Sequence, residues 1–93
     1  MVRIEFDPDK NEANIAQHGI DMAAAADFEF DTAVVSVDSR KRYGETRNIG
    51  VGYIAARLHV LVFTKRRQTL RVISLRKANK REAKAYHDQA QET

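Results

Sequence analysis

Cationic and hydroxyl side chains gather where an apolar run of the chain gives way to a basic segment. The stretch LRVISLRKANKREAKAY, residues 70–86, places six of them around this point: Arg71, Ser74, Arg76, Lys77, Lys80 and Arg81. A guanidinium can bind a phosphate through two parallel hydrogen bonds, and a nearby hydroxyl can donate another. This group of residue types therefore indicates a surface that binds an anionic partner.

The charge of the whole chain is also unevenly distributed. Residues 1–31 hold eight acids and two bases, a balance of −6, and residues 40–84 hold fourteen bases and two acids, a balance of +12. Such a basic segment could bind nucleic-acid phosphates, stabilise a phosphoryl transition state, or dock an acidic protein. A solvated basic surface is the plain alternative, and composition alone leaves all of these open.

Strand alternation predicts which of these side chains point together. In a regular strand Arg71 shares a face with Ile73 and Leu75, while Ser74 shares the other face with Arg76. We therefore expect Ser74 and Arg76 to form a phosphate cradle. Arg71 is expected on the opposite face, unless the strand twists or bulges near its end. A buried Arg71 would need a carboxylate partner, which the acidic N-terminal helices could supply.

Other catalytic groups are sparse in the sequence. The chain has no cysteine, its three histidines are far apart and its acids form no cluster, so we expect no metal site and no magnesium-dependent nuclease. Neither a P-loop nor a nucleophile elbow occurs. Glu45 could form a surface ion pair with Arg47 or a neighbour, or act as a general base. Tyr43, Tyr53 and Tyr86 could pack or stack on bases.

The elements that must position these residues follow from the same sequence. VRIEF alternates as a half-buried strand does, and DPDKNEANIAQHG is typical of a helix capped by Asp7 and ended by Gly19. Asp21 can cap a second short helix, MAAAADF. The segments AVVSVD, TRNIGVGYIA, LHVLVFT and TLRVISLR read as strands, and HVLVF, which does not alternate, as a central one. Asn79 and Glu82 predict a capping box that opens the last helix.

This order, β-α-α-β-β-β-β-α, predicts an α+β fold in a single domain over residues 1–93. Its sheet is expected to be mostly antiparallel, with two N-terminal helices and one C-terminal helix. Gly50 and Gly52 fall on one face of their strand, which predicts close packing of a helix there or the approach of a ligand backbone. The segment DSRKRYGETR predicts a mobile loop, which the three consecutive residues Arg40, Lys41 and Arg42 make basic. The longest apolar run is too short to span a membrane.

Three segments, in this order and spacing, match a known pattern. They are FDPDKNEANIAQHGI, residues 6–20, GETRNIGVG, residues 44–52, and RVISLRKANKREAKAY, residues 71–86. Through them the chain resembles the BrnT toxin family. Thr46 stands where family members often have an acid, and Glu45 lies one place earlier. In the third segment six residues are in register: Arg71, Ser74, Arg76, Ala78, Glu82 and Tyr86.

The resemblance implies that the protein is the toxin of a bacterial type II toxin–antitoxin system. It also implies a RelE-like fold, a cytoplasmic location and no cofactor. It implies an endoribonuclease that inhibits translation and is held inactive by a cognate antitoxin, which would supply the DNA binding. We expect the RNA 2′-hydroxyl to attack its adjacent phosphate without help from a metal ion.

The residues assigned to this chemistry form two sets. The candidate catalytic residues are Arg76, Arg71, Ser74, Arg47 and Glu45. The candidate RNA contacts are Lys77, Lys80, Arg81, Arg40, Lys41, Arg42 and Tyr86. The competing hypothesis is a non-catalytic basic module that binds nucleic acid or an acidic protein partner.

Overall fold

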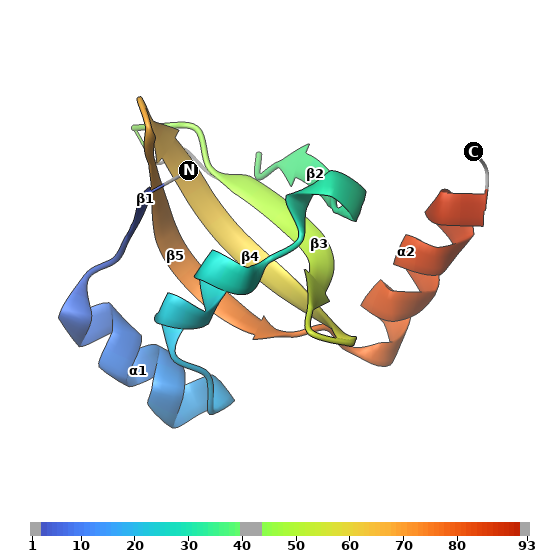
Figure 1. The fold of residues 1–93 in the computed structure, drawn as a ribbon, viewed down its shortest axis with the longest axis horizontal. Helices are drawn as coiled ribbons and strands as arrows, with labels where there is room; N and C mark the ends of the chain where they lie inside the picture. The colour runs from blue at the N-terminus through green and yellow to red at the C-terminus, as the bar shows by residue number, and fades with distance from the viewer. Residues whose placement is uncertain (1–2, 40–43, 92–93) are drawn as a thin grey trace.

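The computed structural model describes residues 3–39 and 44–91, and only the backbone of residues 90 and 91. The strands are β1 (Arg3–Glu5), β2 (Val34–Val37), β3 (Asn48–Ile54), β4 (Arg57–Arg66) and β5 (Thr69–Lys77). The α-helices are α1 (Pro8–His18) and α2 (Lys80–Gln91), and two 3₁₀ helices lie between α1 and β2: η1 (Met22–Asp27) and η2 (Phe30–Thr32). Figure 1 shows α1 and η1 on one side of the sheet and α2 on the other.

The sheet has the strand order β1-β5-β4-β3-β2, so β4 is its central strand, as its lack of alternation predicts. The sheet is mixed and not antiparallel, because β1 runs parallel to β5 while the other three pairings are antiparallel. Alternation over a few residues indicates which side chains face the core, but it does not fix the direction of the neighbouring strand. The expectation of a mostly antiparallel sheet is corrected to a mixed sheet by the parallel pairing at this edge.

The second predicted helix is a 3₁₀ helix. Asp21 caps it as expected, since its side chain accepts a hydrogen bond from the backbone N–H of Ala23. Only six residues, Met22–Asp27, adopt the helical conformation before Phe28 turns to extended backbone. The buried ring of Phe28 requires the chain to turn toward the sheet at this point, and a short 3₁₀ helix allows that turn.

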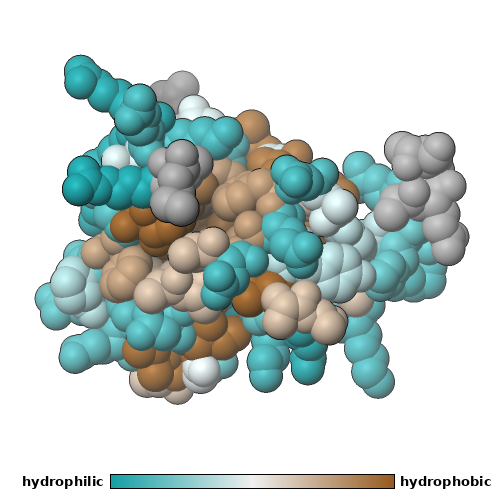
Figure 2. Space-filling model, in the orientation of Figure 1, coloured by the Kyte–Doolittle hydropathy of each residue, from teal (hydrophilic) through white to brown (hydrophobic). Residues whose placement is uncertain are grey.

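The core lies between η1 and one face of the sheet. Met22, Ala25 and Phe28 pack there against five buried residues of β4 and β5: Leu61, Phe63, Leu70, Val72 and Leu75. The apolar region continues to the surface, where brown residues lie among teal hydrophilic side chains (Figure 2). No helix among the described residues is both long enough and apolar enough to cross a membrane.

Gly50 and Gly52 allow this close packing. A Cβ atom added at Gly52 would lie 2.8 Å from Cζ of Phe28 and 2.9 Å from Cβ of Ala33, which is too close for either neighbour. At Gly50 the nearest atoms would be 3.5 Å away, an ordinary contact. Of the two predicted uses of the glycine face, close packing is therefore the one that the structure has.

The predicted helix ends are confirmed by their hydrogen bonds. The carboxylate of Asp7 accepts from the N–H groups of Asp9 and Lys10, and Gly19 ends α1 with a left-handed φ of 72°. At the start of α2, the N–H of Glu82 donates to Oδ1 of Asn79 at 2.8 Å, and the N–H of Asn79 donates to Oε1 of Glu82 at 2.9 Å. This reciprocal pair fixes where α2 leaves β5.

Candidate nucleic-acid interface

Ile73 is an extra residue in β5. Val62 of β4 lies opposite Ser74, and the next residue, Phe63, lies opposite Val72, so Ile73 has no partner in β4. This arrangement is a β-bulge, which changes the alternation of the bulged strand. Side chains on the two sides of Ile73 therefore do not follow the simple rule of every second residue.

The bulge brings the predicted phosphate-binding residues to one face. β4 pairs with β3 without interruption, so Val60, Val62 and Thr64 point to the same side. Their partners in β5 are, in the same order, Arg76, Ser74 and Arg71. Arg71 and Arg76 therefore do not emerge on opposite faces as regular pairing predicts, because the strand has the bulge that was named as the exception. We call this side of the sheet, opposite η1 and the core, the arginine face.

Arg71 is held by a carboxylate from β1. Its Nη1 lies 3.4 Å from Oε1 of Glu5, and the two side chains are 29% and 42% exposed. The partner is a strand residue and not one from the acidic helices, because the parallel pairing of β1 with β5 places Glu5 directly beside Arg71. Arg71 therefore remains accessible to a ligand and is not buried.

Arg76 makes the tightest ion pair among the described residues of this face. Its Nη1 and Nη2 donate to Oε1 and Oε2 of Glu82 at 2.8 and 2.7 Å, and Nη1 also lies 3.3 Å from the carbonyl oxygen of Lys77. The hydrogen bond from Arg76 holds the pKa of the Glu82 carboxyl below its ordinary value of 4.5, although partial burial opposes this shift. Glu82 therefore stays ionised and fixes the orientation of the Arg76 guanidinium.

Glu82 was expected only as a helix cap, so its contact with Arg76 was missed. The signal is present in the sequence as a capping box that begins directly after a strand ending in Arg76 and Lys77. A cap of this kind places the carboxylate of Glu82 at the junction of strand and helix.

Glu45 and Arg47 lie toward the end of the arginine face that is farther from Arg76. Oε2 of Glu45 is 3.0 Å from Nη2 of Arg66, so its ion-pair partner comes from β4 and is not Arg47. The N–H of Asp38 donates to the carbonyl of Arg47 at 2.8 Å, which extends the β2–β3 ladder. Continuing the alternation of β3 by one residue places Arg47 on the arginine face.

The candidate RNA contacts are not all brought together. Lys80 and Arg81 are exposed in the first turn of α2, beside Arg76. Lys77 is also exposed, but it lies opposite His59 and therefore on the other face of the sheet. The remaining bases of this set lie outside the described residues: Arg40, Lys41 and Arg42.

Tyr86 occupies a packing position. It is 8% exposed, its ring meets that of Tyr53 edge-on at 5.7 Å, and its hydroxyl donates to the carbonyl of Thr32 at 2.8 Å. These contacts attach α2 to the sheet and leave little of the ring surface for a base. We therefore do not include Tyr86 in the RNA surface proposed below.

The carboxylates on and beside this face form ion pairs with arginines. Glu5, Glu45 and Glu82 each pair with one arginine. Within residues 3–39 and 44–91, no three histidine, aspartate or glutamate side chains come together as a metal-binding group. The arrangement can bind and orient an anion, and the guanidinium groups supply its positive charge.

Comparisons with known proteins point to a family of ribonuclease toxins. A family described as "Ribonuclease toxin, BrnT, of type II toxin-antitoxin system" matches residues 6–82, which include β5 and the start of α2. The crystal structure of the Brucella abortus ribonuclease toxin BrnT has a similar fold, with a TM-score of 0.64 and 27% sequence identity. The match covers 86% of this chain and 100% of that one. A comparison with curated proteins gave no match.

Proposed function

Because the chain belongs to the BrnT family of type II toxin–antitoxin ribonuclease toxins, we propose that it cleaves RNA on its arginine face by a metal-independent transesterification. The observation that carries this assignment is the β-bulge at Ile73, which places Arg71, Ser74 and Arg76 on one accessible side of the sheet. Two guanidinium groups and a hydroxyl on a rigid strand can hold one phosphodiester in a fixed orientation.

The proposed reaction begins at the RNA 2′-hydroxyl. The 2′-oxygen bonds to the adjacent phosphorus as its proton passes to a base, and the P–O5′ bond breaks as the 5′-oxygen takes up a proton from water. The products are a 2′,3′-cyclic phosphate and a 5′-hydroxyl. Arg76 and Arg71 stabilise the additional negative charge that develops on the phosphoryl oxygens, and Ser74 donates a hydrogen bond to one of them.

Proton transfer is assigned to Glu45 as the candidate base. Glu82 is less suited to this role, because its lowered pKa makes its carboxylate a weaker proton acceptor and both of its oxygens already accept hydrogen bonds from Arg76. Arg47 is proposed to assist in charge stabilisation from the adjoining strand. The pairing of the nearby carboxylates with arginines supports a mechanism in which guanidinium groups, and not a divalent cation, neutralise the phosphate.

The substrate-binding surface extends from this centre to the bases at the start of α2. Lys80 and Arg81 can bind flanking phosphates there, and Lys77 can do so only from the edge of the sheet. The three bases at residues 40–42 stay in the proposal as further RNA contacts on the strength of their sequence alone.

Membership of the family also implies that an antitoxin protein regulates this chain. We propose that a cognate antitoxin covers the arginine face, and that the antitoxin, not this chain, contacts DNA. A toxin that blocks translation by cutting RNA acts in the cytoplasm, and we place the protein there. On the same grounds we assign its fold to the RelE-like group and treat residues 1–93 as one domain, which the span of the family match supports.

The test is incubation of the pure, antitoxin-free chain with RNA in excess EDTA, followed by analysis of the product ends. We expect cleavage to continue and to yield 2′,3′-cyclic phosphate and 5′-hydroxyl termini, and a 2′-deoxy substitution at the cleaved position to block it. Activity that disappears with EDTA and returns with Mg²⁺ would contradict the metal-independent mechanism. RNA binding without any cleavage would favour the alternative, a non-catalytic binding module.

A further inference from the structure

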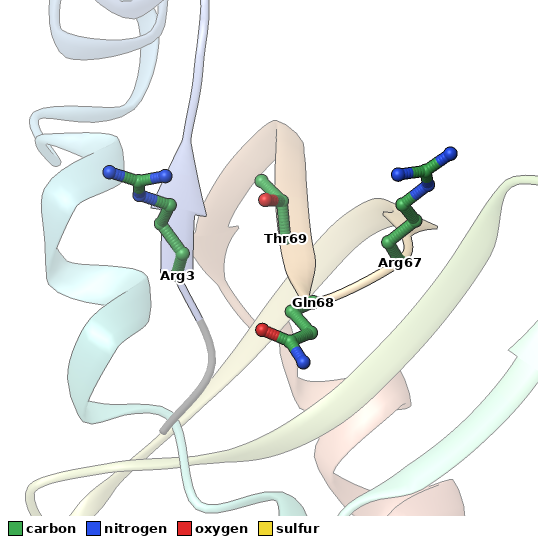
Figure 3. A pocket seen from close by; sticks show the side chains of 4 residues that line it. All are labelled: Arg3, Arg67, Gln68 and Thr69. Atoms are coloured by element: carbon green, nitrogen blue, oxygen red, sulfur yellow. The ribbon is translucent and has the colours of Figure 1, made fainter.

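A second group of cations lies at the end of the sheet where β4 turns into β5. The cations at this turn are Lys65 and Arg66, which precede it, and Arg67, which lies within it. Arg3 of β1 lies beside the turn, since the N–H of Arg3 donates to the carbonyl of Gln68 at 3.1 Å. An open hollow of about 590 Å³ is lined there by Arg3, Arg67, Gln68 and Thr69. In Figure 3 the side chains of Arg3 and Arg67 stand on either side of Thr69.

This hollow continues the arginine face. Arg3 lies opposite Thr69 in the parallel pairing, two residues before the pair of Glu5 with Arg71. Residues two apart in a strand share a face, so Arg3 and Thr69 point to the same side as Arg71. At about 3.3 Å per residue along β5, Thr69 is roughly 7 Å from Arg71 and roughly 20 Å from Arg76. A polyanion that lies along β5 can therefore contact both sites.

Arg3 and Arg67 differ from the other arginines of this face in their pairing. Arg66 and Arg71 are bound to Glu45 and Glu5. Among the residues that the structure describes, no ion pair includes Arg3 or Arg67. Two guanidinium groups without carboxylate partners beside a threonine hydroxyl form a place for an anionic oxygen group.

The backbone at Arg67 gives independent support. Arg66 pairs with Thr69, so Arg67 and Gln68 are the two central residues of a tight hairpin, and Arg67 has a φ of 55°. This left-handed conformation favours glycine or asparagine and is strained for a long side chain. The turn itself therefore does not account for arginine at this position, whereas a contact made by its side chain would.

We propose that the hollow binds a phosphate of the RNA substrate at a nucleotide neighbouring the cleaved bond, on the Arg71 side of the proposed centre. This inference rests on the proposed ribonuclease function. The continuity of the hollow with the arginine face favours an RNA backbone over an acidic protein, because one strand can pass from Arg76 along β5 to Thr69. A contact with a phosphate that does not itself react binds substrate and transition state equally, so it lowers KM and leaves kcat unchanged.

The test uses the full chain with two variants, Arg67→Gly and Arg3→Gln, and two 2′-O-methyl RNA oligonucleotides that cannot be cleaved. One is a dinucleotide, and the other has about ten nucleotides, within the usual site size for single strands. We expect each variant to bind the longer RNA about tenfold more weakly and the dinucleotide as the parent does. The slope of log affinity against log salt should fall by about 0.7 for the longer RNA. With cleavable RNA, KM should rise while kcat is unchanged.

Two control variants separate the charge from the strain. Ala55 has a φ of 53° at the first central position of the β3–β4 turn, so Ala55→Gly relieves the same kind of strain without removing a charge. Arg67→Gly and Ala55→Gly should both raise Tm, and only Arg67→Gly should weaken binding of the longer RNA. Lys10→Gln on α1, across the sheet from the arginine face, removes one exposed positive charge and should not change RNA affinity.

Two results would overturn the proposal. One is parental affinity of both variants for the longer RNA, and loss of antitoxin binding beside it would make the hollow a protein-docking surface. The other is an equal loss of affinity for the dinucleotide, which would place the hollow at the cleavage centre. Because the 2′-O-methyl oligonucleotides report binding without cleavage, an inactive parent would contradict the ribonuclease function and still allow the hollow to be tested.

Discussion

Arg71 and Arg76 project from the same face of β5 although an odd number of positions separates them. Thr64 and Val60 of the regular strand β4 lie opposite them and share that face. Ile73 is an extra residue without a partner in β4, and this extra residue brings the two arginines onto one face. The two arginines differ in how they are held, since Arg71 has one long contact with Glu5 and Arg76 has two short ones with Glu82.

The alanine variants of these two arginines should therefore differ in stability and agree in activity. Arg71→Ala breaks a partly exposed ion pair and should change the free energy of unfolding by less than about 1 kcal/mol. Arg76→Ala leaves the half-buried Glu82 carboxylate without its partner and should cost about 1–3 kcal/mol. Both should lower kcat about 100-fold, because each removes a proposed donor to the phosphoryl oxygens. Urea denaturation and single-turnover RNA cleavage measure the two effects separately.

Arg76→Lys is the informative companion to these variants. Lysine keeps the charge but cannot form two parallel hydrogen bonds with Glu82 or with a phosphate. We expect Arg76→Lys to bind RNA with the affinity of the parent and to cleave it more slowly than the parent does. If Arg71→Ala cleaves RNA at the parental rate, the bulge does not bring a second catalytic arginine into the site.

Glu82→Gln should change how stability depends on pH. The pKa of Glu82 is lowered from 4.5 by its hydrogen bond with Arg76, so the folded protein binds this proton less readily than the unfolded chain does. The stabilisation from Glu82 is therefore complete above its unfolded pKa and is lost as the pH falls through its lower folded pKa. The stability gap between parent and variant should be widest near neutral pH and close in acid. Denaturant titrations at pH 7 and at several values below 4.5 measure this gap.

Asp88→Asn provides the matched control on the same helix. Its carboxylate pairs with Lys84 at 2.7 Å, but the two side chains are 58% and 77% exposed, so the pair should contribute little. We expect its unfolding curve to follow that of the parent at neutral pH. A constant gap between parent and Glu82→Gln across the acid range would show that the charge of Glu82 does not stabilise the fold.

Local signals in the sequence predicted much of the fold. Asp7, Gly19 and the Asn79–Glu82 box mark helix ends through contacts within a few residues of each other, and the structure confirms all of them. The central position of β4 followed from its unbroken apolar run. These features depend on short stretches of chain, which is why their pattern could be read directly.

The missed features depend on long-range pairing. The bulge at Ile73 exists only in the register of β5 against β4, and nothing in the sequence VISL marks which residue lacks a partner. The contact of Arg71 with Glu5 joins residues 66 positions apart through the parallel pairing of β1. Arg67 was not predicted as a site residue because its turn lacks the glycine or asparagine that marks such hairpins.

Gly52→Ala and Gly50→Ala should separate packing from chain flexibility. At Gly52 a new Cβ would lie 2.8 Å from the Phe28 ring, so overpacking should cost about 1–3 kcal/mol. At Gly50 the nearest atoms are 3.5 Å away, and alanine should be neutral or stabilising by about 0.4–1 kcal/mol, since it restricts the unfolded chain. Thermal unfolding of both variants checks this order. Equal stabilities would mean that Phe28 and Ala33 can move away from the sheet at little cost.

Asn14 connects the N-terminal helix to the part of β5 that carries the proposed site. Its amide Nδ2 donates to the carbonyls of Ile20 and Leu75 at 2.9 and 2.8 Å, and its Oδ1 accepts from the N–H of Leu75 at 3.2 Å. β1 pairs with β5 only as far as Arg71, so Leu75 has no neighbouring strand on that side. The buried side chain of Asn14 takes the place of that strand.

Asn14→Ala should therefore lower both stability and activity. The N–H and C=O of Leu75 would lose their partner in a buried place, which should cost about 1–3 kcal/mol. Because Leu75 lies between Ser74 and Arg76, loosening its backbone should also lower kcat while RNA affinity changes little. Gln17→Ala, an exposed change on the same helix, is the control and should leave both quantities unchanged. A stable Asn14→Ala variant with parental kcat would mean that β5 keeps its shape without this contact, and that the bulge alone positions the arginines.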